Sequence, residues 1–332
     1  MKYIEIKNSI ITIKEKNIRD INKWEVLIKM KYAWLCWSDL HKINDENFIQ
    51  QNILWHEIVW EIIQSKNFND IWKTVAVNPI ITCWKCDYCK HTSSQFCERI
   101  HSLWKDLDWW FSEFIIAPQK NIYFLKSDFE SKLWILLDWE AVILHALKLM
   151  KKKFNKGTHL KIAIIWSWSI ALLLGITLKI LSIHQITIIC KKEKESYFTM
   201  QWFQCLDFFN KEDMSDYFDV VFECVWGSQP DTINFAINST KKKWMIIWLW
   251  VFKENYLADL NIRKLLYKEI TLQWSNSFNC NSNSNDFLEG YNIIKKNQDR
   301  FIKVLWNSYN IKNFNEWISN KNNYLKTFFY FD

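Results

Sequence analysis

Residues 162–176 read IAIIWSWSIALLLGI and place two tryptophans, Trp166 and Trp168, between two apolar runs. The first run, residues 162–165, is uncharged and typical of a strand that is buried on both faces of a parallel sheet. The second run begins at residue 169 and has the length and apolar content of a buried helix. Because a tight turn from strand to helix requires small residues, the two indoles at this corner need an explanation.

The composition points to the same anomaly across the whole chain. The 332 residues include 4 glycines and 22 tryptophans. Average usage would give roughly 23 glycines in a chain of this length. The two counts together are close to an ordinary glycine count, which suggests that many of the tryptophans occupy glycine positions.

The pattern of apolar runs predicts an α/β fold in two domains. Runs such as EVLIKM, EIVWEII and TVAVNPIIT predict a strand-rich domain over residues 1–130. From residue 131 to 276, buried-strand runs such as QITIIC and FDVVFECV alternate with segments of helix length, which predicts a doubly wound parallel sheet. The Asn- and Ser-rich stretch NSFNCNSNSND, residues 276–286, predicts a loop.

Charge and cysteine content narrow the class of protein. The balance of 43 basic and 36 acidic residues gives a net charge of +7, too small an excess to indicate a nucleic-acid or membrane partner. The longest apolar run is shorter than the ~20 residues of a membrane-spanning helix, and the N-terminus lacks the apolar core of a signal peptide. The nine cysteines are an odd number, so we expect a reduced, cytoplasmic chain with a metal site.

Four cysteines form the strongest local motif, with the spacing C-x2-C-x2-C-x7-C. They are Cys83, Cys86, Cys89 and Cys97. Four thiolates in a short segment suit a tetrahedral structural zinc with no open position. An iron–sulfur cluster is the main alternative, although ferredoxin-type motifs have a shorter last spacing followed by proline, where this chain has Glu98. Unligated thiols are the remaining interpretation.

A second group of ligand-type residues lies in AWLCWSDLH, residues 33–41, and LWHEIVWE, residues 54–61. Cys36 and His56 are zinc-ligand types, and a nearby carboxylate would complete an open, catalytic site. Ser38 and His41 follow Cys36 by two and five residues and are placed to carry a proton away from a bound alcohol. Taken alone, each of these residues also has an ordinary structural interpretation.

Glycine at positions 166 and 168 would change residues 164–171 to IIGSGSIA, a dinucleotide-binding fingerprint. Ser167, Ser169 and Ile170 would surround the pyrophosphate turn, and Ala171 would supply the third small residue. As printed, each indole would bury roughly 150–250 Å² and fill the space that the pyrophosphate needs.

The same replacement restores known patterns elsewhere, including GLCGSDLH from residue 34, GHEIVGE from residue 55 and CGKC from residue 83. With it, the chain closely resembles the zinc-containing medium-chain dehydrogenase/reductase family, particularly its sorbitol and secondary-alcohol dehydrogenase branch. We hypothesise that these positions are glycine in the organism, encoded by UGA codons that a common translation table reads as tryptophan. A genuinely tryptophan-rich divergent relative is the alternative.

The resemblance implies a GroES-like catalytic domain formed by residues 1–130 and 277–332, with a Rossmann domain inserted over residues 131–276. It implies that Cys36 and His56 bind a catalytic zinc, that Glu57 binds or approaches it, and that a further carboxylate completes the site. Counting back seven residues from His145 selects Asp138, where the family more often has Glu followed by Pro. Glu140 is the second choice for this carboxylate.

The implied chemistry is hydride transfer between an alcohol and a nicotinamide cofactor. Zinc would bind and polarise the alcohol, and Ser38 with His41 would carry the proton away. The resemblance implies two zinc ions, one catalytic and one structural, a small secondary alcohol or polyol as substrate, and a homodimer or homotetramer.

The residue about 20 positions after the turn indicates whether NAD or NADP is preferred, because a carboxylate there would bind the ribose hydroxyls of NAD. That place falls on Cys190, followed by Lys191 and Lys192. A missing carboxylate beside two cations favours NADP over NAD, although a solvated lysine-rich loop would look the same.

Three other functions remain open. A threonine or sugar dehydrogenase of the same family is the nearest. A zinc-ribbon protein that stacks sugars or bases on exposed tryptophans would need its indoles on one face. If the tryptophans are real, the chain is an enzyme with a blocked cofactor site that folds poorly.

Overall fold

The computed structural model describes residues 1–7, 10–34, 57–102, 111–126, 128–153, 159–166, 169–208, 214–225, 230–249, 259–281, 283–305, 307–310, 313 and 327–330. The chain divides into two compact units. Unit 1 comprises Met1–Asp138 and Asn279–Asp332, and unit 2 comprises Trp139–Phe278. The expected α/β organisation, with a strand-rich domain and a Rossmann domain, is confirmed.

Unit 1 is built mainly from antiparallel strands. They are β1 (Lys2–Lys7), β2 (Ile10–Glu15), β3 (Glu25–Trp34), β4 (Glu57–Gln64), β5 (Thr74–Val77), β6 (Ile80–Ile81), β7 (His101–Ser102), β8 (Phe111–Ser112), β9 (Phe114–Pro118), β10 (Ile122–Phe124), β17 (Asn307–Asn310) and β18 (Thr327–Tyr330). The main sheet has the order β10-β5-β4-β3-β18-β17, with β9 also paired to β3, and a smaller sheet has the order β2-β1-β8. Alternate apolar side chains of β3, β4 and β5 form the buried face.

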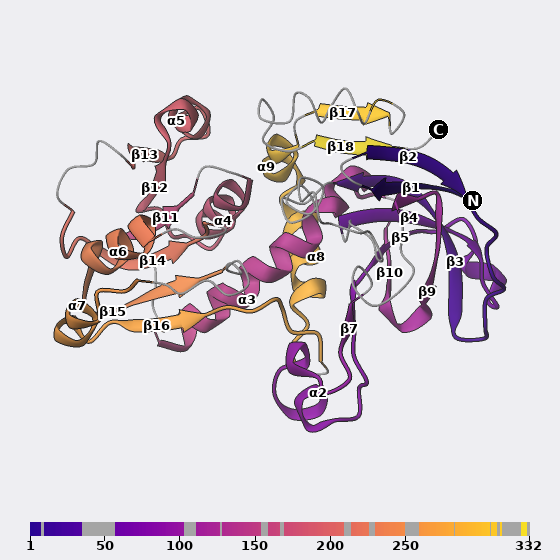
Figure 1. Cartoon of the computed structure of the whole chain (residues 1–332), viewed down its shortest axis with the longest axis horizontal. Helices are drawn as coiled ribbons and strands as arrows, with labels where there is room; N and C mark the ends of the chain where they lie inside the picture. The colour runs from indigo at the N-terminus through magenta and orange to yellow at the C-terminus, as the bar shows by residue number, and fades with distance from the viewer. Residues whose placement is uncertain are drawn as a thin grey trace. The chain divides into compact units, whose positions relative to one another are not determined.

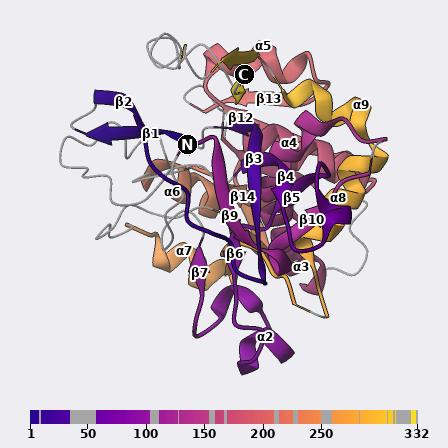
Figure 2. The same ribbon diagram turned by 90° about the vertical axis from the view of Figure 1, so that its right-hand side faces the viewer.

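Helical segments of unit 1 are short. They are α2 (Asp87–His91), α8 (Asp286–Lys296) and α9 (Gln298–Phe301), with 3-10 turns η1 (Phe68–Asp70), η2 (Ser94–Phe96), η3 (Gln119–Asn121), η4 (Ser131–Leu136) and η5 (Ile302–Val304). Strands β6 and β7 pair and lead into a lobe, residues 83–97, that carries α2 and η2 (Figure 2).

The boundaries of the units differ by a few residues from the predicted 130/131 and 276/277. The structure divides after Asp138 and after Phe278. The eight residues 131–138 stay with unit 1 because η4 packs against β3 and β4 and buries Leu133 to Leu136 there. Helix α3 (Leu137–Lys153) then carries the chain into unit 2.

Unit 2 is a doubly wound parallel sheet (Figure 1). Its strands are β11 (Ile162–Ile165), β12 (Ile186–Cys190), β13 (Gln204–Asp207), β14 (Phe218–Glu223), β15 (Thr240–Trp248) and β16 (Thr271–Trp274), in the order β13-β12-β11-β14-β15-β16. Besides α3, its helices are α4 (Ser169–Ile180), α5 (Lys192–Thr199), α6 (Pro230–Ser239) and α7 (Ile262–Lys268). All residues of β11, β12 and β14 are buried, including the polar Thr187 of β12 and the acidic Asp219 and Glu223 of β14.

The strand order fixes where a ligand would bind in unit 2. The chain runs from β11 outward to β12 and β13, then returns to β14 on the other side of β11. In open α/β sheets, ligands bind outside the carboxyl ends of the strands at this switch point. The turn after β11, which contains Trp166, lies there.

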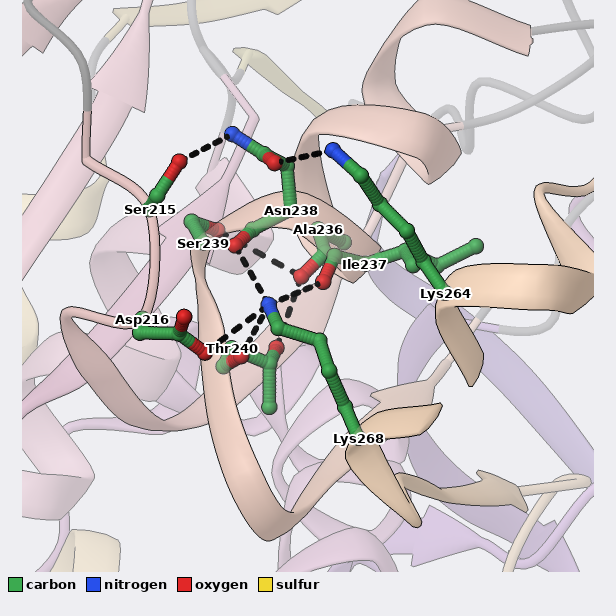
Figure 3. Close-up of polar contacts among 9 residues, drawn as sticks. All are labelled: Ser215, Asp216, Ala236, Ile237, Asn238, Ser239, Thr240, Lys264 and Lys268. Carbon is green, nitrogen blue, oxygen red and sulfur yellow. Dashed lines mark hydrogen bonds and ion pairs between the residues drawn. The ribbon is translucent and has the colours of Figure 1, made fainter. Parts of the chain in front are cut away.

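A buried lysine closes the end of helix α6 (Figure 3). The ammonium group of Lys268, the last residue of α7, donates to the carbonyls of Ile237 at 2.9 Å, Asn238 at 2.6 Å and Thr240 at 2.7 Å. It also lies 3.1 Å from the carboxylate of Asp216. These contacts satisfy carbonyls that have no partner within the helix and thereby join α6, α7 and the start of β15.

Three tryptophans have a backbone conformation that favours glycine. Trp72, Trp84 and Trp202 have φ values of 68°, 58° and 64°, and they supply three of the eight non-glycine residues with positive φ in the described chain. Their side chains are 71%, 41% and 87% exposed, so packing of the indole does not offset the strain. Trp202 follows α5 in a Schellman-type end, with the Phe203 amide donating to the Phe198 carbonyl at 3.2 Å.

We therefore expect Trp72→Gly, Trp84→Gly and Trp202→Gly each to raise the free energy of unfolding by roughly 1 kcal/mol, because a left-handed residue with a Cβ is strained. Trp24 is the matched control, since it is 68% exposed but has no positive φ. Trp24→Gly should give no gain and could cost up to about 1 kcal/mol in chain entropy. Urea denaturation of the four variants measures this, and equal effects at all four positions would contradict the assignment.

Within the described ranges, no helix combines the length and the apolar character that crossing a membrane requires.

Candidate active site and metal-binding lobe

The lobe brings the four predicted cysteines together. The sulfur atoms of Cys83, Cys86, Cys89 and Cys97 all lie within 4.8 Å of one another. Cys83 and Cys86 are half-buried, whereas Cys89 and Cys97 are buried. This is the arrangement of donors that a single tetrahedral metal ion requires.

Backbone amides donate to the sulfurs of Cys83 and Cys97. The amides of Lys85 and Cys86 donate to Cys83 Sγ at 3.4 Å and 3.3 Å. These two hydrogen bonds, the first from Lys85, lower the pKa of Cys83 to about 6. The Cys83 amide in turn donates to Cys97 Sγ at 3.3 Å. The pKa of Cys86 is also lowered, first by the Cys89 amide, whereas burial raises the pKa of Cys89 and of Cys97. The thiolate is therefore favoured at Cys83 and Cys86 only.

Trp84 lies inside this lobe, between Cys83 and the two donating amides. Its φ of 58° turns the chain so that the next two amides face the Cys83 sulfur. Glycine reaches this conformation without strain, which supports CGKC as the functional form of the motif.

The predicted cofactor turn lies at the carboxyl end of β11. The Trp166 amide donates to the Ile189 carbonyl at 3.0 Å and continues the pairing with β12. Its half-buried indole packs against the buried cluster that includes Ile165, Ile189 and Trp248. Ser169 and Ile170 begin α4 directly after the turn, and Ser167 and Trp168 lie outside the described residues.

Cys190, Lys191 and Lys192 lie at the end of the neighbouring strand. Cys190 ends β12 and is buried, Lys191 caps α5 and Lys192 is its first residue, with both lysines exposed. A further carboxylate comes from β13, where Asp207 pairs with Cys190. The sequence spacing did not indicate Asp207, because the contact depends on the pairing of β12 with β13.

Two buried carboxyl groups in unit 2 were not predicted as functional residues of that unit. Glu223 ends β14 at the same edge as Trp166, and Thr232 Oγ1 donates to it at 2.9 Å. Glu140 in α3 is fully buried and accepts from Thr177 Oγ1 of α4, with both oxygens at 3.0 Å. Burial raises the pKa of each carboxyl group to about 8, and the hydroxyl hydrogen bond opposes the shift.

These raised pKa values predict a specific pH dependence of stability. Between the unfolded value of 4.5 and about 8, the folded chain holds two protons that the unfolded chain has released. The free energy of unfolding should therefore fall as pH rises through this window, by up to about 1.4 kcal/mol per pH unit for each carboxyl group.

Glu140→Gln and Glu223→Gln should each remove about half of this slope, and the double variant should remove nearly all of it. Glu193→Gln, at an exposed position in α5, is the control and should leave the slope unchanged. Chemical denaturation at a series of pH values measures the slopes. Single variants with the parental slope would show that neither carboxyl group is buried as described.

Asp138 and Glu140 occupy different environments, although they lie two residues apart in α3. Asp138 is half-buried and belongs to unit 1. Glu140 belongs to unit 2 and is directed at Thr177. Of the two carboxylates, Asp138 is therefore the one available to unit 1.

Several predicted residues of the catalytic site lie outside the described residues. They are Cys36, Ser38, His41 and His56. Glu57 is the first residue of β4, and its side chain is not among those the structure describes.

The segment after Phe278 takes part in a partly buried polar cluster that the sequence did not indicate. Asn285 donates from Nδ2 to the Tyr123 hydroxyl at 3.0 Å, and the Cys280 thiol donates to Asn285 Oδ1 at 3.5 Å. Burial raises the pKa of Cys280 to about 12, and the negative charges of Asp286 and Asp138 contribute to the increase. The Asn-rich stretch is therefore a loop, as expected, but one with buried contacts.

Comparisons with known proteins agree with this architecture. Residues 22–127 match the family described as alcohol dehydrogenase GroES-like domain. The chain is 33% identical to L-galactonate-5-dehydrogenase of Escherichia coli over 130 residues, which cover 37% of this chain and 38% of that protein. It is 30% identical to sorbitol dehydrogenase of Bacillus subtilis over 161 residues, which cover 46% and 45%. The chain thus aligns with less than half the length of these curated relatives.

Solved structures cover the whole chain at lower identity. Galactitol-1-phosphate dehydrogenase from Escherichia coli matches with a TM-score of 0.85 and 19% identity, covering 99% of this chain and 100% of that one. S. aureus TarJ in complex with NADPH matches with a TM-score of 0.78 and 20% identity, covering 99% and 98%. At these identities the two structures establish the fold alone, and the family match adds a GroES-like domain over residues 22–127.

The four-thiol lobe, the switch point at β11 and these matches lead to one assignment. Residues 22–127 carry an alcohol dehydrogenase GroES-like domain, and the whole chain has the fold of the dehydrogenase structures that it matches, as its resemblance to the zinc-containing medium-chain dehydrogenase/reductase family predicts.

Proposed function

We propose that the protein is a zinc-dependent oxidoreductase that transfers a hydride between a secondary alcohol or polyol and NAD(P). The observation that carries the proposal is the switch point of the parallel sheet at β11, followed by a turn with the fingerprint spacing, in a chain that also has a GroES-like unit. A homodimer or homotetramer is the expected assembly.

We assign the catalytic roles by sequence position. Cys36, His56 and Asp138 would hold the catalytic zinc, with Glu57 beside it, and Ser38 and His41 would carry the substrate proton to solvent. When bound, zinc supplies Lewis-acid polarisation of the substrate oxygen. The engagement of Glu140 with Thr177 supports Asp138 as the carboxylate of this set.

The lobe fits a structural zinc. Its four sulfurs lie within 4.8 Å of one another, and amides of the chain already donate to two of them. All four donors come from the protein, so no position would remain open for a substrate. We assign this ion a structural role.

The printed residues at the cofactor turn do not fit a dinucleotide. The Trp166 indole packs where the pyrophosphate would approach the backbone. Glycine at positions 166 and 168 would leave that space open in front of the first amides of α4, which suit an anion. The proposed activity therefore belongs to the chain with glycine at the tryptophan positions, hereafter the glycine form.

The test is a panel of polyols, sugar alcohols and L-threonine offered to the glycine form, with reduced nicotinamide followed by absorbance. A polyol or secondary alcohol should be oxidised, and Asp138→Asn should lower kcat/KM at least about tenfold. Glu140→Gln is the matched control two residues away and should retain activity. Oxidation of L-threonine alone would instead favour a threonine dehydrogenase, and no turnover of any alcohol would refute the proposal.

We expect the glycine form to prefer NADP over NAD, because Lys191 and Lys192 are exposed beside the ribose position and Cys190 supplies no carboxylate there. Changing both lysines to alanine should raise the KM for NADP by about tenfold and leave the KM for NAD nearly unchanged. Steady-state kinetics with both cofactors measure the change. A strong preference for NAD that survives the double substitution would contradict this assignment.

A further inference from the structure

The metal-binding lobe is hydrogen-bonded to a segment of unit 1 that lies far away in the sequence. Ser94, in the 3-10 turn η2, donates from its amide and its hydroxyl to Asn279 Oδ1, both at 2.9 Å. The Cys280 amide donates back to Ser94 Oγ at 2.8 Å. These three bonds join positions that are about 185 residues apart.

Asparagines of the same segment contact the lobe backbone as well. Asn281 Nδ2 donates to the Thr92 carbonyl at 3.0 Å, and Asn279 Nδ2 reaches the same carbonyl at 3.4 Å. Ser94, Asn279, Cys280 and Asn281 are all buried. Buried polar groups that lose their partners cost about 1–3 kcal/mol each, so this set stays together only while the lobe keeps its shape.

The segment connects the lobe to the start of α8 and to Tyr123 of β10. The Asn279 amide donates to Asp286 Oδ2 at 2.7 Å, and the Asp286 amide donates to the Asn279 carbonyl at 2.8 Å. Cys280 forms an isolated antiparallel β-bridge with Asn285. Asn285 caps the N-terminus of α8, and its side-chain amide donates to the Tyr123 hydroxyl. A displacement of Asn279 would therefore disturb the whole of residues 279–286.

The lobe has little apart from a metal to hold its shape. Its secondary structure is limited to α2 and η2, joined to the rest of unit 1 by the two-residue strands β6 and β7. Its three aromatic side chains, Trp84, Tyr88 and Phe96, are exposed rather than packed in a core. Small metal-binding modules of this kind take their folding free energy from the metal.

We propose that the four-cysteine lobe is a metal-dependent clamp on residues 279–286, and that loss of the lobe metal releases this segment. The proposal rests on the proposed structural zinc. It makes Ser94 and Asn279 positioning residues, because they act through the segment that they hold. Removal of the lobe metal should then loosen residues 279–286 while the sheet of β3, β4 and β5 stays folded.

The test is hydrogen exchange of the full-length glycine form, measured by mass spectrometry with zinc bound and after the lobe is emptied by Cys83→Ser with EDTA. Zinc per chain is counted in each sample. Exchange in the peptide covering residues 279–286 should accelerate at least about tenfold when the lobe is empty. Peptides from β3, β4 and β5 report whether unit 1 remains folded.

Ser94→Ala tests the clamp without removing a metal ligand. It deletes the hydroxyl that joins Asn279 and Cys280, so exchange in residues 279–286 should rise by a similar factor with zinc per chain unchanged. Ser93→Ala is the matched control in the same turn, because the Ser93 side chain makes no capping hydrogen bond. It should alter neither quantity.

The outcomes separate the clamp from the structural zinc. The lobe could bind zinc while hydrogen exchange in residues 279–286 changes neither on zinc removal nor in Ser94→Ala. That result would overturn the clamp and leave the proposed function intact. Equal acceleration in the β3–β5 peptides would also overturn it, since the metal would then stabilise unit 1 as a whole. A lobe that binds no zinc would overturn both.

Discussion

Replacing Trp166 and Trp168 together by glycine is expected to raise the affinity of the chain for NADPH at least about hundredfold, a gain of about 2.7 kcal/mol. The Trp166 indole is half-buried at the carboxyl end of β11, beside the switch point where a dinucleotide would bind. Glycine removes this obstruction and allows a pyrophosphate to approach the start of α4. Isothermal titration calorimetry of both chains with NADPH measures the difference in affinity.

The matched control is Trp72→Gly/Trp202→Gly, which makes the same chemical change twice at positions with φ of 68° and 64°. It should stabilise the chain without creating cofactor affinity, because neither residue lies at the carboxyl edge of the parallel sheet. If the printed chain binds NADPH as tightly as the double glycine variant, the indoles do not block the site and the interpretation of the turn is wrong.

The second large effect is expected in the lobe. Cys89→Ser should abolish the structural metal site and lower the free energy of unfolding by about 4 kcal/mol or more, because Cys89 is buried among the other three sulfurs. The zinc content should be one ion per chain lower than in the parent protein. Metal analysis with thermal denaturation of the glycine form measures both quantities.

Cys224→Ser supplies the control, since Cys224 is an equally buried thiol in unit 2 that belongs to no group of metal ligands among the described residues. It should cost only about 1–2 kcal/mol, for a hydroxyl in an apolar site, and leave the zinc content unchanged. Equal losses of stability in the two variants, with equal zinc, would show that the lobe cysteines are ordinary buried thiols.

The sequence predicted the features that local patterns encode. Mostly apolar runs at residues 162–165 and 186–190 predicted β11 and β12, because strands covered on both faces are rich in apolar residues. The spacing of Cys83 to Cys97 predicted the thiol cluster, since ligands of a compact metal site lie close together in sequence. The fold class followed from these patterns and is confirmed, and the predicted GroES-like domain is matched over residues 22–127.

Features that depend on tertiary packing could not be predicted in this way. The hydrogen bonds of Ser94 with Asn279 join residues far apart in the chain, and a serine beside a cysteine motif carries no signal of such a partner. Glu140 was considered as a zinc ligand from its spacing alone, whereas its burial against Thr177 depends on the packing of α3 on α4. The division at residue 138 likewise depends on η4 packing against β3 and β4.

The conformation of Trp84 shows how the structure adds to the sequence argument. Composition suggested that tryptophans stand at glycine positions, without indicating which ones demand glycine. Positive φ at Trp72, Trp84 and Trp202 identifies three such positions individually. Trp60 and Trp248, by contrast, are buried at ordinary φ, so the backbone at those positions places no demand for glycine.

The most direct test of the account is the identity of residues 166 and 168 in the protein isolated from its own organism. Peptide mass spectrometry of the segment from Lys161 to Lys179 reads both positions at once, and the gene supplies their codons. The account predicts glycine at both positions, encoded by UGA. Tryptophan at both positions, encoded by UGG, would contradict it, because the turn after β11 would then have no room for the cofactor.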